Sequence, residues 1–464
     1  MAFRINIIGA GLAGSEAALQ LASRGVEVHV YEMRPLINTP IHTGDECAEL
    51  VCSNSFKSTK PTSAAGMLKS ELRMLQSFLL QHAYDAQVPA GGALALDRHA
   101  FSHAVTTQII EHPLISLHRK IVTSPDDLPP ADATIIASGP LTHDKLAHWL
   151  QAKTGGANLA FYDAAAPIVD AASLNDQIIF RASRYNKHTH MTVTDANASS
   201  EVQVGDYLNA PFSKEAYEHF ISHLVAAERV VAKDFETKEL FQACQPIEEI
   251  ARKHMDAPRF GPMKPVGLID PRTNRRPWAA VQLRAENNEK TAYNLVGFQT
   301  NLTFPEQKRV FRLIPGLEHA EFFRYGVMHR NTFINAPAIL HEDMRLKHTT
   351  LHGAPVFLAG QVMGTEGYVE AIASGLVAAL SVYAYITKTP IEPMPKTTAF
   401  GALLAYATNP DTTNYQPMHV NFGILPALSQ PIKKKDERYK AYAQRGAQDM
   451  TTFVESLRSV GMLT

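Results

Sequence analysis

Apolar and polar positions at the start of the chain predict one strand–helix–strand unit. Residues 4–9 form a short apolar run typical of a buried strand, residues 14–23 carry apolar side chains at helical spacing, and residues 26–31 alternate as a second strand. A unit of about 30 residues is typical of the opening of a dinucleotide-binding sheet. We therefore expect a parallel sheet to begin at residue 4.

Further elements of the same kind follow at both ends of the chain. Apolar spacing predicts a helix over 63–83, and strand-like runs lie at 115–122 and 133–137. A strand followed by glycine returns at 355–360, and a long helical pattern covers 369–386. We expect these C-terminal elements to complete the sheet that begins near the N-terminus.

The middle of the chain has a different character. It contains many proline and glycine turns, a helical pattern over 214–232, and short β-like runs at 177–180, 202–208, 279–283 and 293–298. This mixture is typical of a separate α+β unit. We therefore predict a discontinuous domain made of 1–155 and 331–464, with residues 156–330 as an insertion domain.

Composition narrows the classes of protein that remain. The chain has 464 residues, 45% apolar and 19% charged, so it can bury a core in two or three domains. A formal net charge of -1 excludes a histone-like polycation, and three cysteines exclude a disulfide scaffold and suit a reducing compartment. The uncharged apolar stretch 371–387 is at the short limit for a membrane span. We expect a buried helix there, no leader peptide, no membrane partner and a cytoplasmic protein.

A glycine turn after the first strand carries the strongest local signal. The pattern G-x-G-x-x-G is formed by Gly9, Ala10, Gly11, Leu12, Ala13 and Gly14. The first glycine permits a tight turn, the second lets the backbone approach a pyrophosphate, and the third lets the helix pack closely on the strand. Glu32 follows the last glycine by 18 residues, at a position where an acidic side chain binds ribose hydroxyl groups.

Two later glycine segments favour FAD over NAD as the dinucleotide. Residues 131–139 form a strand that ends in Ala-x-Gly and resemble the second motif of flavoproteins with two dinucleotide folds. Residues 357–368 resemble their third motif, in which a strand end and a helix N-terminus approach the flavin. The expected FAD contacts in these motifs are Gly139, Gly360, Gln361, Gly364, Gly367 and Tyr368. The predicted fold class is α/β, a Rossmann-like FAD domain of the two-dinucleotide-fold type with an α+β insertion domain.

The cysteines leave two kinds of chemistry open. Cys47 and Cys52 have the C-x4-C spacing of the redox-active pair in flavin disulfide reductases. Against a reductase, the sequence contains no second G-x-G-x-x-G motif for a tightly held NAD(P) domain. Cys244 lies instead in the predicted insertion, close before a basic run.

That basic run, residues 252–278, indicates an anionic partner. It holds seven basic residues against two acidic ones in a nearly neutral chain. The candidate contacts within it are Lys264, Arg275 and Arg276. A second cluster over 433–445, with six basic and two acidic residues, has the spacing of a basic helix face.

Nine sequence blocks together resemble one family. They are GAGLAGSEAA, AELVCSNSFKS, AAGMLKSEL, CQPIEE, FGPMKPVGL, YNLVGFQTNL, RLIPGL, RYGVMHRNTFINAP and GQVMGTEGYVEAIASG. From residue 4 to about 385 the chain resembles the TrmFO family, the folate- and FAD-dependent tRNA (uracil-5-)-methyltransferases related to the GidA flavoproteins. It departs from the family pattern at Phe56-Lys57, at Asn301 in place of a histidine, and at the additional Cys47.

The resemblance implies a reaction and its participants. The implied product is 5-methyluridine in the tRNA T loop, at uridine 54, with the carbon taken from 5,10-methylenetetrahydrofolate and with FAD reduced by NADH or NADPH. Cys52 and Cys244 fall on family cysteines implicated in catalysis. The candidate folate contacts fall in or beside the matched blocks and are Arg284, His329 and Asn331. No metal-ligand spacing and no signal for a protein partner is present in the sequence.

Thiol chemistry explains why two cysteines suit this reaction. Uracil C5 is a poor nucleophile until a thiolate adds at C6 and turns the ring into an enolate. We assign the nucleophile to Cys244 and the base that removes the C5 proton to Cys52, and the opposite assignment stays open. The alternative functions are an rRNA-directed uracil-5 methyltransferase, a GidA-like enzyme acting on a wobble uridine, for which we expect a longer chain, and the Cys47/Cys52 reductase.

Overall fold

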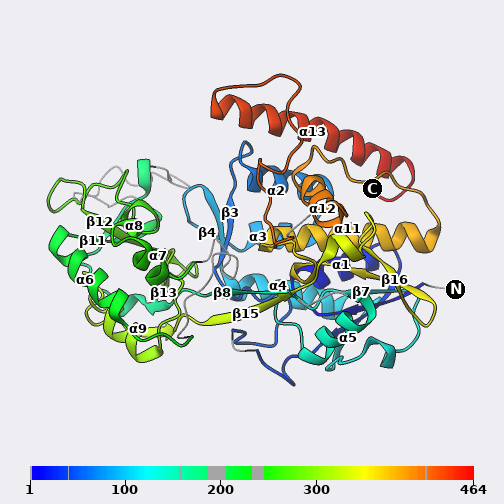
Figure 1. The fold of residues 1–464 in the computed structure, drawn as a ribbon, viewed down its shortest axis with the longest axis horizontal. Coiled ribbons are helices and arrows are strands. Elements are labelled where there is room, and N and C mark those ends of the chain that lie inside the picture. Colours follow the sequence, from blue (N-terminus) through cyan, green and yellow to red (C-terminus); the bar gives the residue numbers. More distant parts are fainter. Residues whose placement is uncertain are drawn as a thin grey trace.

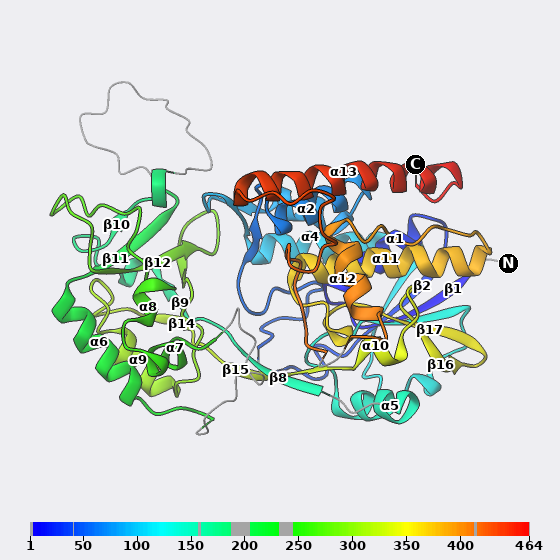
Figure 2. The ribbon, with the colours of Figure 1, turned by 45° about the horizontal axis from the view of Figure 1, so that its top comes forward.

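Two hydrophobic cores organise the molecule. The computed structural model describes residues 3–39, 41–155, 159–186, 205–231, 245–412 and 415–463. Within them, one core draws on residues 5–150 and 333–463 and the other on residues 166–320, and we refer to the main lobe and the second lobe. Figures 1 and 2 show the two lobes, with β8 (Leu159–Ala164) and β15 (Met328–Phe333) running between them.

The main lobe is built on a sheet that is parallel except at one edge. Among the described residues its strands follow the spatial order β16 (Arg345–Leu351), β17 (Ala354–Leu358), β7 (Ala133–Ile136), β1 (Arg4–Ile8), β2 (Glu27–Glu32) and β6 (Ile115–Arg119). β16 pairs antiparallel with β17, and the other pairs are parallel. β17 lies beside β7, so a late segment completes a sheet that begins at residue 4.

Helix α1 (Leu12–Ala22) is buried along its whole length and packs against α11 (Tyr368–Thr387). The two helices approach so closely that a Cβ at Gly375 would lie 2.1 Å from the Ala13 carbonyl oxygen. Among the described residues, α11 is the one helix long and apolar enough to cross a membrane, and 78% of that stretch is buried in the protein. The prediction of a buried core helix is confirmed.

The remaining elements of the main lobe flank this sheet (Figure 1). The helices are α2 (Ala64–Met74), α3 (Phe78–Asp85), α4 (Arg98–Glu111), α5 (Asp144–Thr154), α10 (Ala336–Ile339), α12 (Ala399–Thr408) and α13 (Lys435–Ser459). A small antiparallel sheet has the order β3 (Ser55–Ser58), β5 (Ala93–Leu96) and β4 (Gln87–Val88).

The single helix predicted over 63–83 is wrong, because the chain breaks between α2 and α3. Gln76 adopts a positive φ of 60°, which ends α2. The buried carboxylate of Glu16 on α1 then accepts hydrogen bonds from the Ser77 hydroxyl (3.0 Å) and the Leu79 amide (2.9 Å). This contact satisfies the free amides at the start of α3, so a tertiary contact overrides helical periodicity.

The second lobe contains an antiparallel sheet and short helices. Among the described residues the strand order is β10 (Phe180–Arg181), β11 (Tyr207–Phe212), β12 (Ala279–Ala285), β13 (Ala292–Leu295), β9 (Ile168–Asp170) and β14 (Phe322–Arg324). The helices are α6 (Lys214–Ala226), α7 (Ile247–Lys253), α8 (Ala257–Phe260) and α9 (Phe304–Phe311). The predicted strand 177–180 is reduced to β10 because a turn occupies 176–178, and the predicted helix from 214 ends at Ala226.

Candidate active site

A cavity of about 1800 Å³, open solvent at its mouth included, lies where four parallel strands end. The carboxyl ends of β1, β2, β7 and β17 all reach its wall, which is the edge where open α/β sheets bind ligands. Other lining residues come from outside the sheet and include Cys52, Asp163, Gln299, His329 and Asn331. The cavity therefore lies between the sheet and the strands that connect the lobes.

The glycine turn forms one end of the cavity. Gly9 has a φ of +101°, and a Cβ at Gly14 would lie 1.9 Å from the Gly9 carbonyl oxygen, so both glycines serve close helix–strand packing. A Cβ at Gly11 would meet no atom within 4 Å. Of the six predicted residues, those in the cavity wall are Gly9, Gly11, Leu12 and Ala13, whereas Ala10 and Gly14 lie outside it. The backbone at Gly11 is thus open to a ligand at the N-terminus of α1.

Glu32 ends β2 beside this turn and is 5% exposed. Its Oε2 accepts a hydrogen bond from the Ala10 amide (2.8 Å), and its Oε1 accepts bonds from the amide and the Nε of Arg34 (3.0 and 2.9 Å). Burial would raise the pKa of Glu32, but the Arg34 charge and these hydrogen bonds hold it below its ordinary value. Glu32 is therefore an ionised acceptor in the cavity wall.

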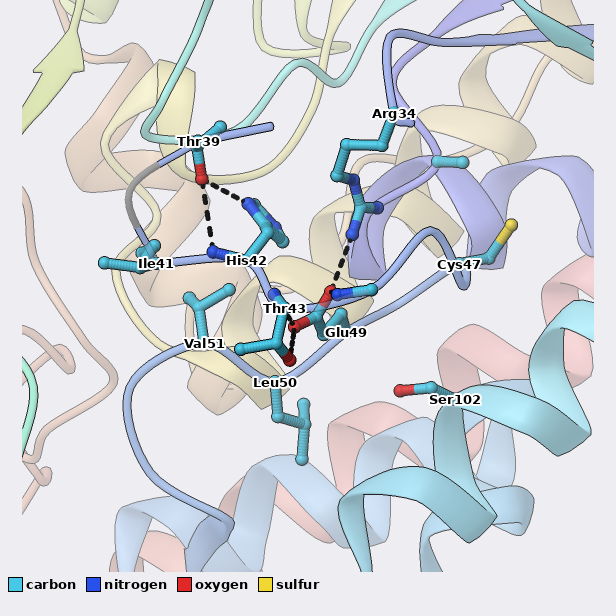
Figure 3. Close-up of polar contacts among 12 residues, drawn as sticks. Arg34, Thr39, Ile41, His42, Thr43, Cys47, Glu49, Leu50, Val51 and Ser102 are labelled. Atoms are coloured by element: carbon cyan, nitrogen blue, oxygen red, sulfur yellow. Dashed lines mark hydrogen bonds and ion pairs between the residues drawn. The ribbon is translucent and has the colours of Figure 1, made fainter. Parts of the chain in front are cut away.

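The segment 41–51 contributes His42, Glu49 and Val51 to the cavity wall, and Figure 3 shows its polar contacts with Arg34 and Thr39. Arg34 Nη1 donates to Glu49 at 3.0 Å, and Glu49 also accepts bonds from the amide and hydroxyl of Thr43 (2.7 and 2.8 Å). His42 donates its amide to the Thr39 hydroxyl at 3.3 Å. Burial lowers the pKa of His42 to about 4, with the nearby Arg34 charge acting in the same direction, so the ring is neutral at pH 7.

Cys47 is buried and does not line the cavity. Burial raises the pKa of its thiol to about 11, which disfavours the thiolate needed for redox exchange. Figure 3 shows its sulfur directed away from Val51, the residue that precedes Cys52. Cys47 and Cys52 are both free thiols. The structure thus offers no support for the reductase interpretation.

Cys52 is in the cavity wall and its backbone is held from three directions. The amides of Cys52 and Ser53 donate to the Tyr368 hydroxyl at 2.7 and 3.1 Å. Arg98 Nη1 donates to the Leu50 carbonyl at 2.5 Å, and Arg324 Nη2 donates to the Val51 carbonyl at 2.7 Å. The thiol itself donates to the Ala164 carbonyl at 3.6 Å. This arrangement fixes the thiol at the surface of the cavity.

A buried polar cluster faces the same cavity. The Nδ1 of His329 and both polar side-chain atoms of Asn331 have no hydrogen-bond partner among the described residues, although both residues are buried. His329 Nε2 lies 3.8 Å from Asp163 Oδ2, and Gln361 donates to the Glu366 carboxyl. Burial, together with the Asp163 charge, raises the pKa of Glu366 to about 8. Buried polar atoms normally have a hydrogen-bond partner, so these atoms are candidates for contact with a polar ligand.

The other predicted residues occupy different positions. Gly139, Gly360, Gln361, Gly367 and Tyr368 line the cavity, whereas Gly364 packs against Tyr415, with a Cβ-to-Oη distance of 2.2 Å if a Cβ were added. Arg284 does not line the cavity: it is buried and its Nε donates to Asn54 Oδ1 at 2.7 Å, so it braces the segment after Cys52. Cys244 lies outside the described residues.

Some basic side chains of the run 252–278 already have partners within the second lobe. The Arg259 guanidinium lies 3.7 Å from the centre of the Trp278 ring, and Arg272 forms a 2.6 Å ion pair with Asp270. The cations that remain exposed and that the sequence singled out are Lys264, Arg275 and Arg276. They lie outside the cavity wall, on the surface of the second lobe.

Sequence reasoning missed several residues of this site. Asp163 and Glu366 face the cavity, and Arg98 supports Cys52 from a buried ion pair with Glu286 (2.5 Å). Lys57, a departure from the family pattern, lines the cavity and lies 3.4 Å from Glu370. The position of Glu366 between two glycines of the third flavin motif was the one available signal for it.

Asn301, another departure from the family pattern, does not line the cavity. Its amide donates to Glu248 at 2.6 Å, and its side chain exchanges two hydrogen bonds with the backbone of Val231 (3.0 and 3.1 Å). Ile247 in turn donates its amide to the Gln299 carbonyl at 2.7 Å, and Gln299 lines the cavity. The departure thus affects backbone support rather than a direct cavity contact.

Comparison with known proteins gives a consistent picture. A family model described as glucose inhibited division protein A matches residues 4–390. A protein of Natranaerobius thermophilus named methylenetetrahydrofolate–tRNA-(uracil-5-)-methyltransferase TrmFO is 48% identical over 452 residues, covering 97% of this chain and 99% of that protein. A Geobacter sulfurreducens protein of the same name is 51% identical over 435 residues, covering 94% and 95%.

A solved structure shares the fold. The crystal structure of Aquifex aeolicus GidA superposes with a TM-score of 0.65 at 14% identity, covering 100% of this chain and 74% of that one. At this identity the match shows the architecture alone. It supports an α/β fold with a largely parallel sheet.

Proposed function

The chain belongs to the TrmFO family, within the group described as glucose inhibited division protein A, and from this premise we propose that it is a methylenetetrahydrofolate–tRNA-(uracil-5-)-methyltransferase. Its product is 5-methyluridine in the T loop of tRNA, at uridine 54. The observation that carries the proposal is near-full-length similarity to enzymes of that name, joined to a cavity that presents Cys52 beside unpartnered polar atoms.

FAD is the proposed cofactor of the main lobe, residues 1–155 and 331–464, as a domain of the two-dinucleotide-fold type. The cavity fits it, because added Cβ atoms at Gly11 and Gly139 would meet no atom within 4 Å, which leaves backbone amides accessible to a pyrophosphate. The ionised Glu32 can accept hydrogen bonds from ribose hydroxyl groups. When bound, FAD supplies the reducing equivalents of the reaction, and NADH or NADPH is the proposed source of electrons.

Folate is the proposed donor of the carbon, as 5,10-methylenetetrahydrofolate. A pterin ring has polar edges and a flat face, which match the unpartnered atoms of Asn331 and the imidazole of His329. Arg284 is proposed to act through Asn54 rather than by touching the substrate, since its guanidinium points at Oδ1 of that residue. The insertion, residues 156–330, is proposed as the side from which RNA and folate approach.

The two cysteines are proposed to have different catalytic roles, one as the nucleophile and one as the base. A thiolate of Cys244 adds to C6, which makes C5 nucleophilic toward the methylene carbon. Cys52, fixed by Tyr368 and Arg324 at the cavity wall, is the base that takes the C5 proton. The transferred methylene must also gain a hydride to become a methyl group, and bound FAD would supply it. Release of the Cys244 thiolate restores the C5–C6 double bond of the uracil.

The basic surface of the second lobe is proposed to bind the RNA backbone. Lys264, Arg275 and Arg276 are exposed there, and the positive charge suits phosphates. The lysines at the start of α13 are a second candidate contact. We propose a cytoplasmic enzyme, the compartment in which tRNA and folate are both present.

The test is a methylation assay on a T-arm hairpin. The purified protein should transfer carbon from labelled methylenetetrahydrofolate with NADPH or NADH, and should transfer nothing from S-adenosylmethionine. An rRNA fragment serves as the competing substrate, and modification of that fragment alone would favour the rRNA-directed alternative. Failure to modify either RNA with a flavin-loaded, folded protein would refute the proposed function.

A further inference from the structure

Three aromatic rings form a stack on the second lobe. The rings of Phe322 and Tyr325 lie 5.2 Å apart with an interplanar angle of 16°, and those of Tyr325 and Phe304 lie 4.9 Å apart at 15°. Phe322 packs against the second core, whereas Phe304 is 51% exposed. The stack is therefore rooted in the core at one end and open to solvent at the other.

A residue next to the stack contacts the segment that carries Cys52. Arg324, next to Tyr325, donates to the Ile41 and Val51 carbonyls at 2.9 and 2.7 Å, and Val51 lines the cavity directly before Cys52. On the other side of Tyr325, a Cβ at Gly326 would lie 2.6 Å from the Ala165 carbonyl oxygen. Figure 2 shows β14 and α9 in the second lobe, where β15 leaves it. The backbone on both sides of Tyr325 is thus held in place, and the residue before it contacts the active-site segment.

Charge near the open end suits a polyanion. Phe304 and Lys308 are four residues apart on α9, so they share one face of the helix, and Lys308 is exposed. The neighbouring Arg309 side chain is 45% exposed and pairs with Glu306. An exposed aromatic face beside cations matches a nucleic-acid base beside its phosphates.

We propose that Phe304, Tyr325 and Phe322 are a stacking platform for an unpaired base of the substrate RNA. This inference rests on the proposed function, because it takes the substrate to be a nucleic acid whose target uridine enters the cavity. When an enzyme draws one nucleotide out of an RNA loop, the neighbouring bases lose their stacking on it. An aromatic platform at the protein surface compensates for that loss. Every base has a flat face, so the platform needs no base-specific hydrogen bond.

The test compares variants at two phenylalanines that are both more than half exposed. Phe304→Ala removes the open ring, and Phe323→Ala is the matched control, because Phe323 is 61% exposed and pairs with no ring among the described residues. Binding of a fluorescein-labelled T-arm hairpin is measured by anisotropy, independently of catalysis. Phe304→Ala should weaken binding about tenfold, Phe304→Trp should restore it, and Phe323→Ala should change it by less than about twofold.

Kinetics and self-association complete the design. Phe304→Ala should raise KM for the hairpin with kcat and flavin content nearly unchanged, since the ring lies outside the cavity wall. Equal RNA affinities of Phe304→Ala and Phe323→Ala would overturn the platform while leaving methylation, and so the proposed function, intact. If Phe304→Ala weakens RNA binding but the wild-type protein methylates no RNA, the proposed function is refuted and the stacking platform is not. A change in sedimentation rather than in RNA affinity would assign the rings to contact with a second copy and overturn the proposal.

Discussion

Replacement of Gly11 by valine is the sharpest test of the cofactor site. Gly11 caps α1 in an extended conformation, with φ -73° and ψ -168°, which a β-branched residue can adopt. An added Cβ meets no protein atom within 4 Å and therefore extends into the cavity. The variant should fold, with a cost of about 1 kcal/mol or less for the weaker helix cap.

Its effect on FAD should be much larger. A hydrogen bond to a charged group contributes about 1.5–3 kcal/mol. Displacing the pyrophosphate from one backbone amide should therefore raise the Kd of FAD about 10- to 150-fold. The Kd is measured by titrating FAD into deflavinated protein, and the free energy of unfolding by urea denaturation of the apoprotein.

Variants at two other glycines serve as controls for this experiment. Gly92→Val is the matched control, since an added Cβ there also meets no atom within 4 Å but Gly92 is outside the cavity wall, so FAD affinity should be unchanged. Gly14→Ala should destabilise the fold itself, because its Cβ would lie 1.9 Å from the Gly9 carbonyl oxygen. A Gly11→Val protein with wild-type FAD affinity would refute the assignment of the pyrophosphate to this turn.

Three further predictions follow from buried groups and thiols. Cys47→Ala should keep FAD and methylation activity, because Cys47 is buried outside the cavity; an inactive but flavin-loaded variant would revive the redox pair. With a 5-fluorouridine T-arm, which has no removable C5 proton, Cys244→Ala should abolish the covalent RNA adduct on denaturing gels, and an adduct lost only in Cys52→Ala would exchange the two roles. Burial raises the pKa of Glu71 to about 7, so the folded state retains a proton that the unfolded chain releases from pH 4.5 upward. Glu71 alone should therefore lower the free energy of unfolding by about 3 kcal/mol between pH 4.5 and 7. The measurement is urea denaturation over this pH range, and a Glu71→Gln variant with the same pH dependence as the wild type would contradict the prediction.

Local signals in the sequence were sufficient to predict the backbone elements that surround the proposed FAD site. The glycine turn, the acid at the end of β2 and the apolar length of α11 each depend on backbone geometry or periodicity within a short segment, so they could be predicted from residues alone. The division of the chain at residues 155 and 331 and the roles of Cys52 and Cys244 stay predictions.

Only tertiary structure decided which side chains meet in the cavity. His329, Asp163 and Glu366 come from β15, β8 and the turn before α11, and no local pattern indicates that the carboxyls and the imidazole share one space. The same is true of Arg284, which braces Asn54 at a separation of 230 residues, and of Glu16, which ends a helical pattern from another element. The amide of Cys52 reaches Tyr368 across 316 residues. Such contacts depend on packing between distant segments, and spacing along the chain carries no information about that packing.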